Sequence, residues 1–190
     1  MSKLISVLKE EIHSDISEDH YIIDKILPFV LNSSIDELFS QANDCIDDEN
    51  FSESLIFYDL ILKKDSKNIH ALIDKGTTLQ NLGRIKLAIR SYDKALDISP
   101  NNIDALINKG SAFHLDKKYS DAISCYDRAL KIDKKCPMAL AYKGLSLAEL
   151  GQLKEAITYF KNALSIDKHY DLAQLSKDTA QDLLKSLQGK

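Results

Sequence analysis

The side chains best suited to metal or acid–base chemistry are scattered along the chain. The five histidines lie at positions 13, 20, 70, 114 and 169, and no two have the spacing of a shared metal site. His20 and His70 each precede an aspartate by one helical turn, which supplies too few ligands to hold a metal ion. Isolated histidines of this kind favour neutral hydrogen bonding. The pattern predicts neither a metal site nor a cofactor.

Three further patterns argue against enzymatic chemistry. The acidic residues at 44–49 resemble part of a calcium loop, but the turn glycine and the distal glutamate are missing, so a solvated turn is the better interpretation. The glycines are isolated, which excludes a glycine-rich phosphate loop. The three cysteines, Cys45, Cys125 and Cys136, form no CxxC pair and predict free thiols in a reducing compartment. We therefore expect a protein that is not an enzyme.

Length and charge narrow the function classes further. The 190 residues suffice for one sizeable domain. The apolar run at residues 4–8 is too short for a secretion signal or a membrane span, so the sequence predicts a cytoplasmic protein without a membrane partner. Basic residues between positions 84 and 131 are interleaved with aspartates and the isoelectric point is about 5.7, which disfavours nucleic acid as a partner.

A period of 34 residues organises most of the chain. Each interval contains two apolar sets with helical spacing and a short turn between them, where Gly83 is suited to end a helix. Each unit is therefore predicted to be an antiparallel pair, with a first helix and a second helix. Small residues let the two helices approach closely, and large ones fill the remaining gap. The recurring sets are Leu72/Leu106/Leu140, Gly76/Gly110/Gly144, Ala88/Ala122/Ala156, Tyr92/Tyr126/Phe160, Ala95/Ala129/Ala163 and Leu96/Leu130/Leu164.

This pattern resembles the tetratricopeptide repeat, whose unit is two helices in 34 residues. The match covers four units, at residues 35–68, 69–102, 103–136 and 137–170, of which the earliest is degenerate but in phase. The resemblance implies an all-α, right-handed α-solenoid of stacked antiparallel helix pairs, with the first helices lining its concave groove. Ser34 and Glu37 form a predicted capping box, Asn102 is a candidate cap, and Pro137 occupies a first-turn position.

Flanking helices are expected at both ends. Residues 171–190 are predicted to form a C-terminal capping helix and tail that leaves the repeat register, with Leu172, Leu175, Leu183, Leu184 and Leu187 on one side. Residues 1–34 are predicted to form N-terminal flanking or capping helices. An open alternative is that they dock into the groove of their own or a neighbouring chain.

The resemblance also indicates where a ligand lies. In this family the groove is lined by the second, fifth, ninth, twelfth and thirteenth positions of each unit, and here these positions contain no lysine or arginine. The clamp that grips a C-terminal carboxylate needs such cations, so we expect none. An apolar ridge is predicted instead, flanked by amides and hydroxyls, with these groove residues: Phe39, Asn43, Ile73, Thr77, Gln80, Ile107, Asn108, Ser111, His114, Ala141 and Leu145.

The predicted function is a protein-interaction scaffold. Its partner is expected to be a protein or peptide segment, for which an apolar helix is the best fit to such a ridge. The alternative is a self-associating structural module, in which residues 1–34 or the oppositely charged ends mediate homo-oligomer formation. Residues 1–68 have 15 acidic and 6 basic side chains, whereas residues 69–190 have 14 and 19.

Overall fold

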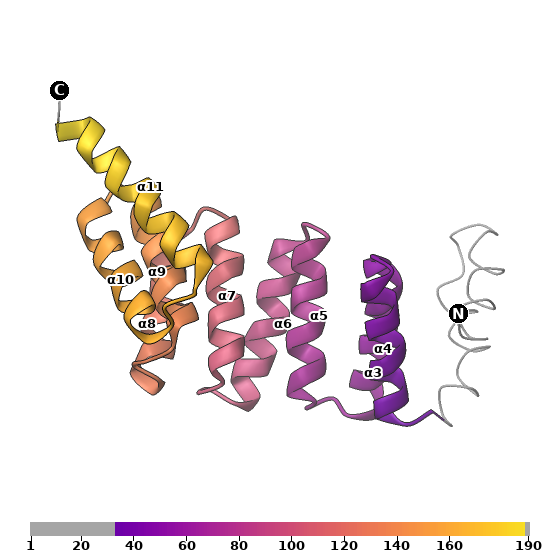
Figure 1. Ribbon diagram of the computed structural model, residues 1–190. Helices are drawn as coiled ribbons and strands as arrows, with labels where there is room; N and C mark the ends of the chain where they lie inside the picture. Colours follow the sequence, from indigo (N-terminus) through magenta and orange to yellow (C-terminus); the bar gives the residue numbers. More distant parts are fainter. Residues whose placement is uncertain (1–32, 189–190) are drawn as a thin grey trace. The chain divides into compact units, whose positions relative to one another are not determined.

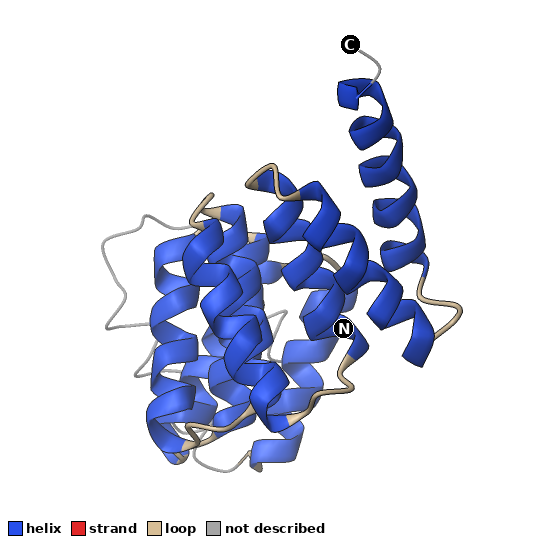
Figure 2. Ribbon diagram, turned by 90° about the vertical axis from the view of Figure 1, so that its left-hand side faces the viewer, coloured by secondary structure: helices blue, strands red, loops and turns tan. Residues whose placement is uncertain are grey.

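The computed structural model describes residues 33–188, and every regular element in that range is an α-helix (Figures 1 and 2). The predicted N-terminal helices of residues 1–34 thus lie outside the described residues, apart from Ser33 and Ser34. The chain divides into two compact units between Ser66 and Lys67. The N-terminal unit contains α3 (Ile35–Asp47) and α4 (Phe51–Lys64). The C-terminal unit contains α5 (Ile69–Asn81), α6 (Ile85–Ile98), α7 (Ile103–Leu115), α8 (Tyr119–Ile132), α9 (Pro137–Glu149), α10 (Leu153–Ile166) and α11 (Asp171–Gln188).

The C-terminal unit is an α-solenoid of stacked helix pairs. Each first helix packs against the second helix that follows it: α5 against α6, α7 against α8, and α9 against α10. Each second helix then packs against the next first helix, so α6 contacts α7, α8 contacts α9 and α10 contacts α11. Because each helix from α6 to α10 packs between its neighbours in sequence, the apolar core runs through the whole stack.

Glycines in the first helices make the close packing of each pair possible. Gly110 on α7 faces the ring of Tyr126 on α8, which is buried. A β-carbon added to Gly110 would lie 2.5 Å from Cε1 of that ring. Gly144 and Phe160 repeat the arrangement in the next pair, with a corresponding distance of 2.6 Å. The 34-residue pairing of glycine with an aromatic residue is therefore a steric match.

The helix ends follow local sequence chemistry. The capping box is confirmed, since Ser34 Oγ accepts from the Glu37 amide at 3.1 Å and the Glu37 carboxylate accepts from the Ser34 amide at 2.8 Å. Asn102 caps α7 through the Ala105 amide, and Pro137 opens α9 in its first turn. Gly83 ends its helix with φ of +71°, and Lys117 adopts the same left-handed backbone with φ of +60°.

The face that α11 turns toward the stack differs from the prediction. Ala173 and Ala180 are its buried residues, whereas Leu175, Leu183 and Leu187 are exposed. These alanines lie 34 residues after Ala139 and Ser146, which are buried in α9. The inward face of α11 therefore keeps the repeat register through small residues, which belong to one apolar cluster with residues of α10, and the predicted leucine side is not this face.

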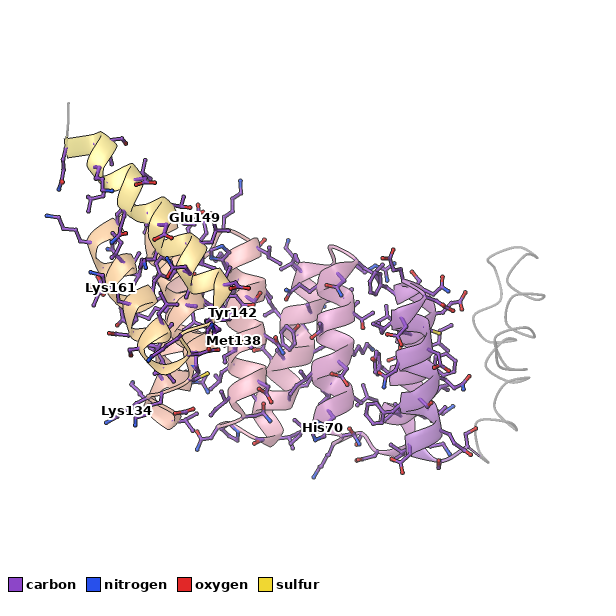
Figure 3. The ribbon with its side chains drawn as sticks, viewed as in Figure 1. His70, Lys134, Met138, Tyr142, Glu149 and Lys161 are labelled. Carbon is purple, nitrogen blue, oxygen red and sulfur yellow. The ribbon has the colours of Figure 1, made fainter. Side chains whose placement is uncertain are left out.

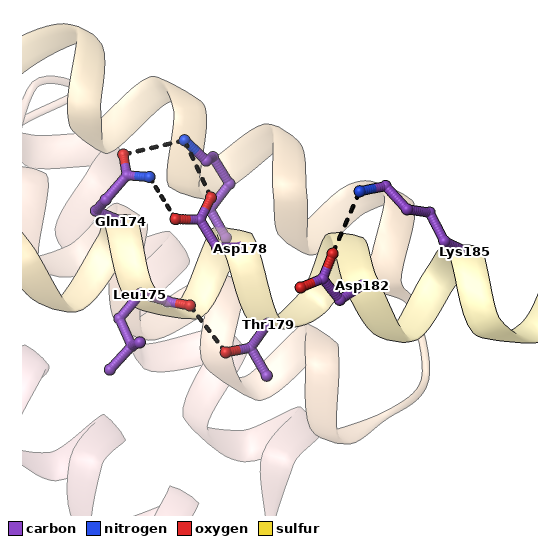
Figure 4. A network of polar contacts seen from close by, with 7 residues as sticks. Gln174, Leu175, Asp178, Thr179, Asp182 and Lys185 are labelled. Atoms are coloured by element: carbon purple, nitrogen blue, oxygen red, sulfur yellow. Dashed lines mark hydrogen bonds and ion pairs between the residues drawn. The ribbon is translucent and has the colours of Figure 1, made fainter.

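The register does break on a second face of α11. The side chains of Gln174, Lys177 and Asp178 form a polar network there, which Figure 4 shows from close by. Gln174 donates to Asp178 at 2.6 Å, and Lys177 donates to Gln174 at 3.0 Å. In the preceding units, the positions of Gln174 and Asp178 hold the leucine and glycine that receive a second helix. This face of α11 is therefore polar where a repeat would need an apolar surface.

Candidate functional site

The first helices of the C-terminal unit share one face of the stack. Helix α5 contacts α7, α7 contacts α9, and α9 contacts α11, whereas the second helices have no comparable contacts with one another. We call the surface formed by α5, α7, α9 and α11 the first-helix face. Its residues occupy the second, fifth, sixth, ninth, twelfth and thirteenth positions of each helix. Since the first helices lie closer together than the second helices, this face is the inner side of the array.

Side-chain hydrogen bonds join neighbouring helices along this face. The Gln80 amide donates to Ser111 Oγ at 3.3 Å, which links α5 to α7. His114 Nδ1 lies 2.9 Å from Ser146 Oγ and links α7 to α9. Burial lowers the pKa of His114, an effect that the nearby Glu149 carboxylate partly opposes. His114 therefore favours the neutral hydrogen-bonding state expected of it.

A cavity of about 300 Å³ opens where α5, α7 and α9 begin. Its lining combines apolar side chains with carboxylates and an amide, and Figure 3 labels two of its members, His70 and Met138. The lining residues are His70, Ile73, Asp74, Asp104, Ile107, Asn108 and Met138. Three predicted groove residues are among them: Ile73, Ile107 and Asn108.

The apolar ridge is more deeply buried than the sequence suggested. Ile107 exposes only 3% of its surface and Ala141 exposes none, so Ala141 cannot contact a ligand in this conformation. Ile73, at 8%, forms part of the cavity floor. The fifth positions of α5, α7 and α9 are thus mainly packing positions. This corrects the assumption that the ridge is an open surface.

The remaining predicted residues are distributed over both units. Thr77 is exposed and its hydroxyl lies 3.3 Å from Tyr92 Oη, while Leu145 is half-buried on α9. Phe39 and Asn43 belong to the N-terminal unit, where the Phe39 ring packs edge-on against Tyr58 with 6.3 Å between centroids. The structure therefore brings Ile73, Ile107 and Asn108 to one cavity, and it describes Phe39 and Asn43 within a separate unit.

Exposed apolar side chains of the first-helix face lie on α7, α9 and α11, and Leu115 on α7 is 55% exposed. Met138 on α9 is 46% exposed, and Leu175 and Leu183 on α11 are 70% and 49% exposed. In Figure 3, Met138, Tyr142 and Glu149 follow one another along α9. The leucines were missed because α11 was assigned a different inward face. Continuing the 34-residue count would have placed Leu175 at a fifth position and Leu183 at a thirteenth.

Two lysines of the first helices form ion pairs with the preceding second helices. Lys109 on α7 forms an ion pair with Asp93 on α6 at 2.5 Å. Lys143 on α9 is buried and lies 2.6 Å from the Asp127 carboxylate and 2.7 Å from Tyr159 Oη. Each lysine is at the seventh position of its unit and reaches back to the preceding second helix. These two cations are paired within the stack, and the groove positions of the first-helix face hold no lysine or arginine.

Two carboxylates of the cavity have no basic partner. Among residues 33–188, neither Asp74 nor Asp104 takes part in an ion pair. Burial raises the pKa of Asp74, and His70 partly offsets the shift. Asp74 occupies a sixth position, which the predicted groove set did not sample in this unit. In the same described range, no group of three or more His, Cys, Asp or Glu side chains is arranged to hold a metal ion.

A second cavity, of about 430 Å³, lies between α10 and α11. Three lysines line it: Lys154, Lys161 and Lys185. Lys185 is already paired with Asp182 at 3.2 Å, and both side chains are largely exposed. None of the predicted groove residues belongs to this cavity. Among the described helices, none is both long and apolar enough to cross a bilayer.

Family models match the chain over residues 78–170. Two models described as Tetratricopeptide repeat match residues 103–136 and 137–170, and a TPR repeat model matches residues 78–117. No relative of this chain was found among curated protein sequences.

Solved structures with the same fold are numerous. A crystal structure of MamA protein is 22% identical with a TM-score of 0.67, covering 78% of this chain and 81% of MamA. A tetratricopeptide repeat protein from Parabacteroides merdae is 21% identical with a TM-score of 0.69, covering 80% of this chain and 60% of its own. The first TPR of Spaghetti (RPAP3), bound to the HSP90 peptide SRMEEVD, is 25% identical with a TM-score of 0.60, covering 64% of this chain and 96% of its own. With its stacked helix pairs and matched repeat models, the chain is a tetratricopeptide repeat protein.

Proposed function

We propose that this chain is a non-enzymatic scaffold that binds a helical segment of a partner protein on the first-helix face, without a carboxylate clamp. The fold is consistent with a protein-interaction scaffold, and the Spaghetti repeat domain is an example that holds a peptide. The observation that carries the proposal is the set of exposed apolar side chains Met138, Leu175 and Leu183 on a face free of lysine and arginine. Apolar anchors on such a face suit an amphipathic helix.

The charge of the face argues against an acidic ligand. The peptide bound to the Spaghetti domain carries two glutamates and an aspartate. On the first-helix face of this chain, Asp74, Asp104 and Glu149 would repel such a peptide, and no cation is present to compensate. We therefore expect SRMEEVD to bind this chain at least about tenfold more weakly than an apolar helical segment of neutral charge.

The experiment replaces two exposed anchors of the face. Leu175→Asp/Leu183→Asp should reduce partner capture at least about tenfold, because two apolar contacts are lost and two charges are introduced. Both leucines are exposed, so the fold should persist. The control is Leu87→Asp, which changes an exposed leucine of the second helix α6. Ile107→Asp is unsuitable, since it would place a charge in the packed interior.

The readout is the set of proteins retained by immobilised wild type, counted by mass spectrometry against both variants. A partner retained by wild type and Leu87→Asp but lost by the double variant supports the proposal. If the folded double variant retains every partner, the first-helix face is not the binding surface. The alternative of self-association through residues 1–34 remains a prediction, which light scattering of the full chain and of residues 35–190 would test.

A further inference from the structure

We propose that the cavity between α5, α7 and α9 receives a lysine or arginine side chain of the bound partner, with its charged end between Asp74 and Asp104. This inference rests on the proposed function, since it specifies the chemistry of the segment bound on the first-helix face. It also reverses the usual charge relation of the family's carboxylate clamp: here the scaffold supplies the anions and the partner supplies the cation.

The charges of the cavity carry the inference. Asp74 on α5 and Asp104 on α7 both line it, and no lysine or arginine does. Neither aspartate is in an ion pair within the described chain, whereas Asp93 and Asp127 on the second helices each neutralise a lysine. Lys109 on α7 and Lys143 on α9 are thus already engaged with the second helices. The negative charge of the cavity is left for an external cation.

The burial of the Asp74 carboxylate favours binding of a cation in the cavity. Desolvation disfavours the charged form of Asp74 and raises its pKa, and the nearby His70 partly opposes this effect. His70 is exposed at the cavity rim. An ammonium or guanidinium group bound here would offset the desolvation of Asp74, and an ion pair with this half-buried carboxylate is screened less by salt than a fully exposed pair.

The apolar part of the cavity fits the stem of a long basic side chain. Ile73 and Ile107 form a floor with little exposed surface, and Met138 forms a flexible, exposed side. Lysine and arginine bury their methylene stems on such surfaces while the charged end reaches polar groups. Asn108 adds a carbonyl oxygen that can accept from the cation. A bare metal ion fits less well, because the described residues contain no group of three ligands.

The test uses three designed helical peptides of eighteen residues with one common leucine stripe. They carry lysine, glutamine or glutamate at the same three flanking positions. Binding to the full chain is measured by fluorescence anisotropy at low salt and again at high salt. We expect the lysine peptide to bind about tenfold more tightly than the glutamine peptide at low salt, and the difference to shrink at high salt.

Two variants assign any preference to the cavity. Asp74→Asn/Asp104→Asn keeps the side-chain shapes and should lower lysine-peptide affinity to that of the glutamine peptide, which itself should not change. Asp97→Asn/Asp121→Asn removes two exposed aspartates of the second helices α6 and α8 and should keep the preference. Circular dichroism verifies that both variants fold.

The outcomes separate this inference from the proposed function. The inference is overturned if wild type binds the lysine and glutamine peptides equally, or if Asp74→Asn/Asp104→Asn keeps the lysine preference. In either case the proposed function stands, provided that Leu175→Asp/Leu183→Asp loses the glutamine peptide. If wild type binds none of the peptides, both proposals fail.

Discussion

Replacing Gly110 with alanine tests the packing logic of every helix pair, because two effects of opposite sign compete. In an unconstrained helix, alanine is more stable than glycine by about 1 kcal/mol. Here the added β-carbon would lie 2.5 Å from Cε1 and 2.8 Å from Cζ of Tyr126. That ring is buried and packs against the Tyr142 ring at a centroid distance of 6.0 Å, so it has little room to move. Overpacking of a core typically destabilises by about 1–3 kcal/mol.

The clash should win, with a net loss of about 1–2 kcal/mol for Gly110→Ala. For a chain of this size this corresponds to a melting temperature about 2–8 °C lower. Urea denaturation followed by circular dichroism at 222 nm measures the free energy directly. Gly144→Ala should behave alike, because Phe160 takes the place of the tyrosine at 2.6 Å.

A second background isolates the cause. In Tyr126→Leu, the shorter side chain leaves room for the new methyl group, so adding Gly110→Ala should be neutral or stabilising. The double-mutant cycle then gives a coupling energy of opposite sign to the single effect. If Gly110→Ala stabilises the wild-type chain, or has the same effect in both backgrounds, the steric explanation of the 34-residue glycine period is wrong.

Three further predictions concern the turn, the core tyrosine and the terminal helix. Lys117→Gly should stabilise by about 0.5–1 kcal/mol in urea denaturation, because glycine relieves the left-handed backbone at φ of +60°; a destabilised variant would contradict this. Burial raises the pKa of Tyr92 from the ordinary 10.0 to about 12. The contribution of the neutral Tyr92 to the free energy of unfolding is therefore fully present below pH 10 and is lost as the pH rises through about 12. Thermal melts across that range should show the loss in wild type and a smaller one in Tyr92→Phe. On α11, Ala173→Leu should destabilise by about 1–3 kcal/mol, whereas Leu175→Ala should stay within about 0.5 kcal/mol; equal effects would mean that the helix is turned differently.

The 34-residue period predicted the helix pairs because sterics repeat with it. Gly110 leaves the space that the Tyr126 ring fills, so the spacing of the two residues reflects a direct contact. Caps were equally predictable, since Ser34, Glu37 and Asn102 act on amides three residues away. Features that depend only on local geometry, or on one contact that recurs in each repeat, can therefore be predicted from the sequence.

The candidate site was harder to predict because exposure depends on neighbours. Ile107 has the side chain of a binding residue, yet contacts between first helices cover all but 3% of its surface. The charge of the first-helix face depends on the direction of the lysine side chains. Lys143 lies on the first helix α9, but its ammonium group pairs with Asp127 on the second helix α8. The orientation of α11 depended on Ala173 and Ala180, whose small size gives a weak apolar signal. In each case the outcome depended on the direction of a side chain and on its burial by neighbouring helices, which the sequence alone does not give.

The polar face of α11 bears on how arrays of this kind change in length during evolution. A duplicated helix pair could continue the array only if Gln174, Asp178 and Gln181 became residues like those of α9: Leu140, Gly144 and Leu147. The inward alanines already have the required size. These three positions distinguish the polar face of α11 from the apolar face of α9, so extending the array from α11 needs at least these coordinated changes.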